Sequence, residues 1–480
     1  MASLDPASES TPRRIDADLV IVGAGYAAMN GLNAAAKYLS PGSRVVVVDR
    51  ERTYGGNWNR QYEYVRLHQP YSMFTAGDQE WDLGVERTHL ASRLEVVDHL
   101  GSVPKVSAGH VDVQPLFRHD YSGHVVRGGK VELDATSLDG RESVRVRASR
   151  MLDARGFRIE PVKPWATDST QVRSIAPSSP VLCTRDFLDD DKPVVVVGCG
   201  KTAMDTILYV AGRSSQRRII HHVSGSGMWF AIRDHIYRVG LDRHFGGMVV
   251  TDGMSDMTLA FDGTNALEIL HTVRGKGAVD QLYPGALNYR FGTMSRAELA
   301  AVREAVTHVH PGHLQGIDGT RFHVRQNGVE RSFELPEHSW VVSCTTHLLD
   351  YPHQPLLQGG GLVCAPQNAL GFTGPTAYFL THAWYRGELA KVADRLFRIE
   401  FQRLPKLRIA FDMATMSTAN LSMLLPLLPP SIPLNFRGDF GRWYPVHRRV
   451  AAALRFKLRG PRLIAKAETN LGTRFADPSD

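Results

Sequence analysis

The sequence predicts an α/β fold with two Rossmann-like domains, the second inserted into the first, and a helical C-terminal extension. Two glycine-rich turns predict the domains, because each follows a run of β-branched residues and opens a helix-forming segment. A basic, partly amphipathic end segment predicts the extension. The chain has 480 residues, 43% of them hydrophobic and 22% charged, which suits a globular protein of two or three domains.

The first glycine turn lies in ADLVIVGAGYAAMN, residues 17–30. Its pattern is Gly23-x-Gly25-x-x-Ala28. The first glycine permits the tight turn, the second lets a pyrophosphate approach the backbone, and the small third residue lets the helix pack on the strand. A second buried strand, RVVVVD, ends at Asp49, where an acid accepts hydrogen bonds from a ribose. This turn therefore predicts a dinucleotide with its phosphates at the start of the helix.

The second glycine turn lies in VVVVGCGKTAMDT, residues 194–206, and has the same strand before it and helix after it. Its pattern is Gly198-x-Gly200-x-x-Ala203. Lys201 and Thr202 open the helix and are candidates for contact with a phosphate. For Lys201 the alternative is a side chain that points to water.

The strand expected after the second turn, RRIIHHVS, ends without an acidic residue and has arginines nearby. A missing carboxylate with an arginine close by is typical of sites that accept a 2′-phosphate, so NADPH is favoured over NADH. The arginines are Arg217, Arg218 and Arg233. Arg233 is the preferred candidate, and a solvated surface position is the alternative for each.

Two turns predict two dinucleotides, and hydride chemistry divides the work between a nicotinamide that donates and a flavin that receives. We therefore expect FAD at the first turn and NADPH at the second, with a FAD-binding domain and an NADPH-binding domain inserted in it. The expected FAD-binding domain comprises residues 15–185 and 350–400, and the NADPH-binding domain residues 190–349. We expect residues 1–14 to be disordered and residues 401–480 to form the basic extension.

Several classes of site are not expected. The four cysteines are scattered, with no Cys-x-x-Cys pair, so neither a redox-active dithiol nor a zinc site is predicted, and we expect no metal. From residue 391 onward 16 basic residues face 7 acidic ones, so the net charge of +7 arises from the C-terminal part and does not indicate nucleic-acid binding. No signal peptide or membrane span is recognised, and a cytoplasmic protein is expected.

The segments GAGYAA, then Asp49, then GGNW at residues 55–58, then GCGKTAMD together resemble the single-chain flavin-containing monooxygenase-like oxidoreductases, from about residue 15 to 390. The resemblance implies that the Gly-Gly-x-Trp segment packs by the flavin and that the following loop, YVRLHQPYSMF, runs past its ring. The residues it implicates in FAD binding there are Gly55, Gly56, Trp58, His68 and Gln69.

The segment GFTGPTAYFLTHAW is similar to the last flavin segment of the family, in which a helix N-terminus faces the flavin. It adds Thr373, Gly374 and Thr376 to the implied FAD site. One departure concerns the Phe-x-Gly-x-x-x-His stretch that such monooxygenases usually carry before the second turn. The chain reads VLCTRDFLDDDKP there, without the glycine or the histidine, which argues most against Baeyer–Villiger chemistry.

The resemblance implies a monooxygenase in which NADPH reduces FAD and the reduced flavin activates O₂ to oxygenate a small organic substrate. The protein then chiefly binds, orients and excludes water, so pocket residues matter more than a catalytic triad. The candidates for direct roles are His68, Gln69 and His235. The alternatives are a one-component flavin halogenase, for which no lysine is marked by its local sequence, and a flavin-bearing redox sensor or binding protein.

The C-terminal extension has two interpretations. The segment HRRVAAALRFKLRGPRLIAKA is basic and partly amphipathic, which suits attachment to anionic lipid. The preferred interpretation is a terminal helical cap over the substrate entrance, with its arginines solvated. The preceding LSMLLPLLPPSIPL is broken by prolines and is no membrane helix. The oligomeric state and the identity of the substrate are not predicted.

Overall fold

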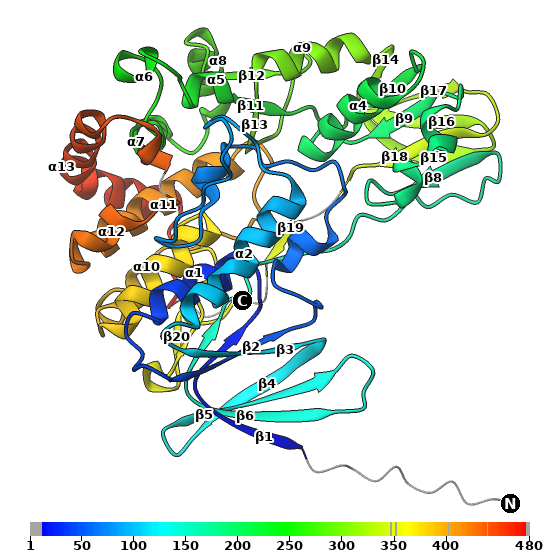
Figure 1. Ribbon diagram of the computed structural model, residues 1–480. Coiled ribbons are helices and arrows are strands. Elements are labelled where there is room, and N and C mark those ends of the chain that lie inside the picture. Colours follow the sequence, from blue (N-terminus) through cyan, green and yellow to red (C-terminus); the bar gives the residue numbers. More distant parts are fainter. Residues whose placement is uncertain (1–11, 346–347, 351–352, 402, 439, 477–480) are drawn as a thin grey trace, which may run out of the picture.

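The computed structural model describes residues 12–345, 348–350, 353–401, 403–438 and 440–476. A mixed sheet and a parallel sheet lie at opposite ends of the molecule, and the helices of the C-terminal part lie beside them (Figure 1). The expected α/β class with two Rossmann-like domains and a helical extension is therefore confirmed.

The first domain is built on an eight-stranded sheet with the path β20-β21-β6-β1-β2-β3, to which β4 and β5 are added as a hairpin. β1 pairs in parallel with both β2 and β6, because the continuous apolar runs bury both faces of these strands. The strands are β1 (Arg13–Val22), β2 (Arg44–Asp49), β3 (Asp112–Phe117), β4 (His119–Arg127), β5 (Lys130–Ser137), β6 (Ser143–Asp153), β20 (Leu357–Gln358) and β21 (Val363–Cys364).

Three helices accompany this sheet: α1 (Tyr26–Ala35), α2 (Arg93–Ser107) and α10 (Thr373–Tyr385). α1 and α10 lie against each other although about 340 residues separate them in sequence. Gly31 lets α1 approach the sheet, since a Cβ atom there would lie 2.3 Å from Leu152 Cδ2. α2 begins with a capping box, in which Ser92 accepts from the Glu95 N–H and the Glu95 carboxylate accepts from the Ser92 N–H.

The second domain is built on a five-stranded parallel sheet with the order β14-β10-β9-β18-β8. Its strands are β8 (Val172–Ile175), β9 (Val194–Val197), β10 (Ile220–Val223), β14 (His308–His310) and β18 (Ser339–Ser343). Helices α3 (Arg185–Leu188), α4 (Lys201–Arg213) and α9 (Arg296–Ala305) belong to this domain, as does the antiparallel sheet of β15 (His313–Asp318), β16 (Arg321–Gln326) and β17 (Val329–Glu334).

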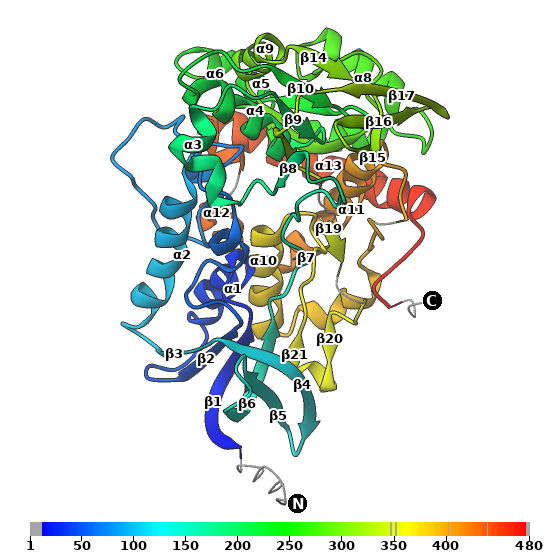
Figure 2. The same ribbon diagram turned by 90° about the vertical axis from the view of Figure 1, so that its right-hand side faces the viewer.

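One expected domain boundary differs in the structure. Residues 172–175 were expected in the first domain, within 15–185, but as β8 they pair with β18 at the edge of the second sheet. The chain passes between the domains through β7 (Phe157–Ile159) and β19 (Leu348–Asp350), which pair with each other in antiparallel fashion. Figure 2 shows this two-stranded ribbon between the lower and upper domains.

A third region arises inside the second domain. The sheet β12-β11-β13 comprises β11 (Trp229–Ile232), β12 (Val279–Gln281) and β13 (Tyr289–Met294). Helices α5 (Arg233–Ile236), α6 (Asp242–Phe245), α7 (Val250–Ala260) and α8 (Ala266–Gly275) accompany it. This region leans away from the second sheet and reaches the C-terminal helices (Figure 1).

The C-terminal extension is helical, as expected, and consists of α11 (Ile409–Leu424), α12 (Ser431–Asn435) and α13 (Val446–Asn470). α11 is buried along nearly its whole length, packed against α7 and α13. α13 covers α7 and α11 with Ala452, Gly460, Leu463 and Ala467. Within the described ranges, no helix combines the length and the apolarity needed to cross a membrane.

Candidate functional site

The first glycine turn has the geometry that a pyrophosphate requires. Gly23 has a positive φ of 102° and its N–H donates to Val48 O at 2.8 Å, which ties the turn to β2. Gly25 is the N-cap of α1, and neither a side-chain cap nor an acidic residue occupies the first turn of this helix. The first N–H groups of α1 are therefore available to an anion, with Ala28 fully buried behind them.

The Gly-Gly-x-Trp segment lies directly on this turn. The Gly55 N–H donates to Ala24 O at 2.9 Å. Gly56 has a φ of 53°, and a Cβ atom there would lie 2.7 Å from the Cα atom of Gly25. Trp58 follows and meets Phe74 edge-on, with ring centroids 5.6 Å apart. The two glycine segments thus form one cradle, and at their contact Gly56 has no room for a side chain.

Asp49 lies at the end of β2, beside the cradle. Its carboxylate accepts from the Ala24 N–H at 2.5 Å and from the Glu51 N–H at 2.7 Å. Burial raises the pKa of this carboxyl, and these two backbone donors oppose that shift. The carboxylate orders the turn and keeps further lone pairs for a ribose.

The N-terminus of α10 meets the N-terminus of α1. A Cβ atom on Gly374 would lie 2.3 Å from the Tyr26 ring, so only glycine fits there. Thr373 lies close to Gly156, and the N-cap Phe372 provides no side-chain cap. Thr376 has a structural role instead, because its buried hydroxyl donates to Phe372 O at 2.6 Å and accepts from the Leu370 N–H at 3.1 Å. Two uncapped helix N-termini therefore converge on the cradle.

The second glycine turn repeats the first. Gly198 has a φ of 129° and its N–H donates to Val223 O at 2.9 Å. Gly200 is the N-cap of α4, again without a side-chain cap, and a Cβ atom there would meet nothing within 4 Å. Ala203 is fully buried. The start of α4 is therefore open to a phosphate, as the start of α1 is.

Lys201 does not point to water in the structure. Its ammonium group pairs with the carboxylate of Asp205, and both side chains are about nine-tenths buried. Tyr62 OH, from the loop after the Gly-Gly-x-Trp segment, donates to the same carboxylate at 2.8 Å. The Thr206 hydroxyl donates to the backbone carbonyl oxygen of Thr202, the next residue of the turn, at 2.8 Å. Lys201 thus takes part in the contact between the two domains.

The candidate arginines are placed differently from one another. Arg233 pairs with Glu298 and donates to His68 O at 3.0 Å, which joins the second domain to the loop after the Gly-Gly-x-Trp segment. Arg218 is buried and donates to the carbonyl oxygens of Phe187 and Lys192. Arg217 is exposed. Neither Arg218 nor Arg233 is free to bind a phosphate in this arrangement.

Two other cations lie at the second turn. Arg290 and Lys406 are exposed and close enough to Cys199, inside the turn, to lower the pKa of its thiol, which burial raises overall. Cys199 itself adjoins Gly225, just past the end of β10, where Ser226 and His313 are hydrogen-bonded at 3.0 Å. Sequence reasoning missed these residues, because no local signal connects them to the turn.

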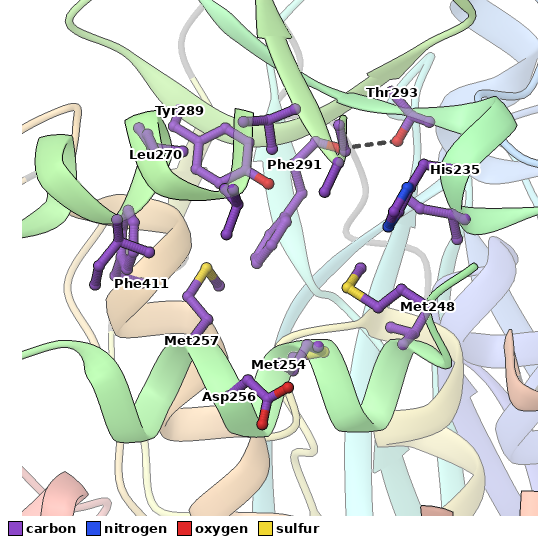
Figure 3. Close-up of a pocket in the computed structure, with 18 of the residues that line it drawn as sticks. His235, Met248, Met254, Asp256, Met257, Leu270, Tyr289, Phe291, Thr293 and Phe411 are labelled. Atoms are coloured by element: carbon purple, nitrogen blue, oxygen red, sulfur yellow. Dashed lines mark hydrogen bonds between the residues drawn. The ribbon is translucent and has the colours of Figure 1, made fainter. Parts of the chain in front are cut away.

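A cavity of about 750 Å³ lies between α7, α8 and the sheet of β11 and β13. Methionine and aromatic side chains form much of its wall, with Met257 of α7 pointing toward Phe291 of β13 (Figure 3). The apolar residues include Met248, Met254, Met257, Tyr289, Phe291, Phe372 and Phe411. The polar ones include three residues that the sequence singled out, His68, Gln69 and His235, and also Arg290 and Thr293.

The surroundings of the two histidines of the cavity disfavour their charged form. Burial and the nearby cations Lys201 and Arg233 lower the pKa of His68 to about 3. Burial lowers the pKa of His235 as well, with Arg238 and Arg296 acting in the same direction. Among the residues that the structure describes, no group of three or more histidine, cysteine or acidic side chains is arranged to hold a metal ion.

The chain was compared with family models, curated proteins and solved structures. No family model matches the chain. Uncharacterized proteins of Mycobacterium tuberculosis and Mycobacterium bovis are 24% identical over 337 residues, which cover 65% of this chain and 58% of theirs. The chain therefore spans less than two thirds of the length of these relatives.

Among solved structures, a polycyclic ketone monooxygenase from the fungus Thermothelomyces thermophila is similar to 95% of this chain and 90% of its own, at 12% identity and a TM-score of 0.53. An oxidized steroid monooxygenase bound to NADP covers 92% of this chain at 14% identity, with a TM-score of 0.49. The likeness to the polycyclic ketone monooxygenase confirms the resemblance for the fold.

Proposed function

We propose that the protein is an NADPH-dependent flavoprotein monooxygenase that oxygenates a bulky apolar substrate. One observation carries the proposal: two glycine turns, each opening an uncapped helix, lie on either side of a loop whose His68 and Gln69 line a large apolar cavity. This arrangement suits electron transfer from one dinucleotide to another beside a substrate. The fold shared with the polycyclic ketone monooxygenase supports it.

The first cradle fits FAD. The start of α1 would hold the pyrophosphate, Asp49 the ribose, and Gly25 and Gly56 leave the close approach that a phosphate needs. The start of α10 would place its positive end toward the flavin and stabilise negative charge there. Bound FAD supplies hydride acceptance and reaction with O₂, while the chain positions it and excludes water.

The second turn fits NADPH. The start of α4 would hold the pyrophosphate, with Gly200 leaving the backbone open. Arg290 and Lys406 are better candidates for the 2′-phosphate than Arg233, because they lie at the turn and no ion pair engages them in the described chain. Arg233 would instead fix the loop that presents His68.

The cavity favours a substrate with a large apolar surface. About 750 Å³ is enough for a drug-sized molecule, and flexible methionines adapt to irregular shapes. Burial favours the neutral form of His68 and His235, in which an imidazole can donate one hydrogen bond and accept another at a polar group of the substrate.

The test is spectroscopic. The purified protein should be yellow, and NADPH should bleach the flavin without oxygen. A screen of apolar compounds should then find one that accelerates aerobic NADPH oxidation and gains one oxygen atom by mass. A gain of halogen in the presence of halide would support the halogenase alternative, and a flavin that NADPH cannot reduce would overturn the proposal.

A matched pair of variants separates binding from folding. Gly200→Val should prevent bleaching by NADPH, because the valine side chain would fill the space through which the pyrophosphate reaches the backbone. The fold should tolerate this side chain, since a Cβ atom at this position meets no protein atom within 4 Å. Gly212→Val, on the same helix and equally open, should bleach like the wild type. Equal behaviour of the two variants would contradict the assignment of the second turn.

A further inference from the structure

The outer face of α13 is apolar and has no partner within the described chain. Val446, Val450, Leu454 and Leu458 recur every four residues and are 67%, 52%, 58% and 81% exposed. Four residues at this spacing form one stripe on a helix, and the stripe lies opposite the face that covers α7 and α11. Capping the protein therefore uses only one of two apolar faces of this helix.

The stripe continues onto the segment around α6. Arg448 donates to the carbonyl oxygens of Arg243 at 3.1 Å and Gly247 at 3.0 Å, and the rings of His244 and His447 stack with centroids 5.7 Å apart. These contacts bring α6 to the start of α13, on one flank of the molecule (Figure 1). The segment adds Leu241, 79% exposed, and Phe245, 89% exposed. We call these six apolar residues the α13–α6 surface.

Positive charge accompanies this surface. α13 holds seven basic residues and one acidic residue. Arg455 and Arg459 pair with Asp252 and Asp256 of α7. In contrast, Arg449, Lys457 and Arg462 lie beside or within the exposed stripe, and none of them makes an ion pair or a side-chain hydrogen bond with the described residues. Lys457 and Arg462 are exposed and Arg449 is half-buried, and no described residue neutralises their charge.

We propose that the α13–α6 surface attaches the protein to an anionic membrane surface. The apolar stripe would enter the boundary between headgroups and acyl chains, and the three unpaired cations would contact lipid phosphates and carboxylates. Lys457 reaches outward from within the stripe by a long apolar stem, as interfacial lysines do. A second copy of the chain fits less well, because its own surface would bring the same unpaired cations face to face.

α7 connects the attached helix α13 with the cavity. α7 binds α13 through Asp252 and Asp256 on one side and lines the cavity with Met254 and Met257 on the other. Two packed helices, α13 and α7, therefore lie between the α13–α6 surface and the cavity. A membrane-dissolved apolar compound would have a short path to the cavity of an attached molecule.

The experiment is flotation of the full-length, purified protein with vesicles. Vesicles of equal parts phosphatidylserine and phosphatidylcholine should carry the wild type upward at low ionic strength, and pure phosphatidylcholine vesicles should carry much less. Leu454→Glu/Leu458→Glu should lower partitioning into the mixed vesicles about tenfold, since it replaces both leucines of the stripe with carboxylates. Arg449→Gln/Lys457→Gln/Arg462→Gln should remove the preference for phosphatidylserine while leaving the apolar stripe intact.

The matched control carries the same kind of change elsewhere. Leu138→Glu/Val329→Glu replaces residues that are 45% and 57% exposed on other parts of the surface, and it should float like the wild type. Circular dichroism melts confirm that each variant is folded. Absence of wild-type flotation, or an equal loss with the control, would overturn the proposal. A concentration-dependent dimer that Leu454→Glu/Leu458→Glu abolishes would overturn it too, by showing that a second copy covers the surface.

Discussion

Arg290 and Lys406 should determine the preference for a 2′-phosphate. Both are exposed, lie at the second glycine turn, and act electrostatically on Cys199. A hydrogen-bonded contact between such a cation and a phosphate contributes about 1.4 kcal/mol, or a factor of about ten in Kd. Arg290→Gln or Lys406→Gln should therefore weaken binding about tenfold, and the double variant about a hundredfold if the two contacts add.

Titration calorimetry measures this directly and without turnover. Adenosine 2′,5′-bisphosphate carries the 2′-phosphate, whereas adenosine 5′-phosphate lacks it, so only the former should lose affinity in the variants. Arg217→Gln is the control, because this arginine is exposed but does not act on the turn. The reasoning is refuted if the double variant still distinguishes the two nucleotides as the wild type does, or if Arg217→Gln abolishes the distinction.

Three further predictions concern stability. Gly56→Ala should destabilise the fold by about 3 kcal/mol in urea denaturation, because its Cβ atom would collide with the backbone of Gly25. Gly42→Ala, with φ of 79° but open space around it, should cost only about 1 kcal/mol, and equal costs would contradict the collision. Asp205→Asn should cost about 3 kcal/mol by leaving the Lys201 ammonium buried without its partner, and an unchanged denaturation midpoint would refute this. Acid should destabilise the protein through three buried histidines whose pKa burial lowers to about 4, below the unfolded value of 6.5. The stability that comes from keeping these histidines neutral is fully present above pH 6.5. Near pH 5.5 each histidine should have lost about 1 kcal/mol of its contribution to the free energy of unfolding. The melting temperature should therefore fall with pH, and replacing these histidines with glutamine should make that fall shallower. These histidines are His99, His222 and His382.

The features of the fold that could be predicted are those with local causes. Gly23 and Gly198 are recognisable because a tight turn between a strand and a helix needs a positive φ within a few residues of a β-branched run. α13 was recognisable by its composition, although Pro461 lies inside it. β8 was not, since four residues between proline-rich and serine-rich segments become a strand only by pairing with β18.

The features that could not be predicted depend on distant contacts. Arg233 lies near the second turn in sequence, but its pairing with Glu298 and its bond to His68 O direct it to the domain contact. Arg290 and Lys406 reach the turn from segments that no spacing rule connects to it. The cavity likewise combines residues of the first domain, of α7 and of α11, which only the tertiary fold brings together.

The ribbon of β7 and β19 constrains how the two domains move. Both crossings of the chain are hydrogen-bonded to each other and therefore form one connection. We expect the domains to move by hinge rotation about this connection and not by shear along it. Swivelling would first open the contacts of Tyr62 with Asp205 and of Arg233 with the His68 carbonyl. Since that carbonyl belongs to a residue of the cavity wall, we expect each opening of the domains to reshape the cavity.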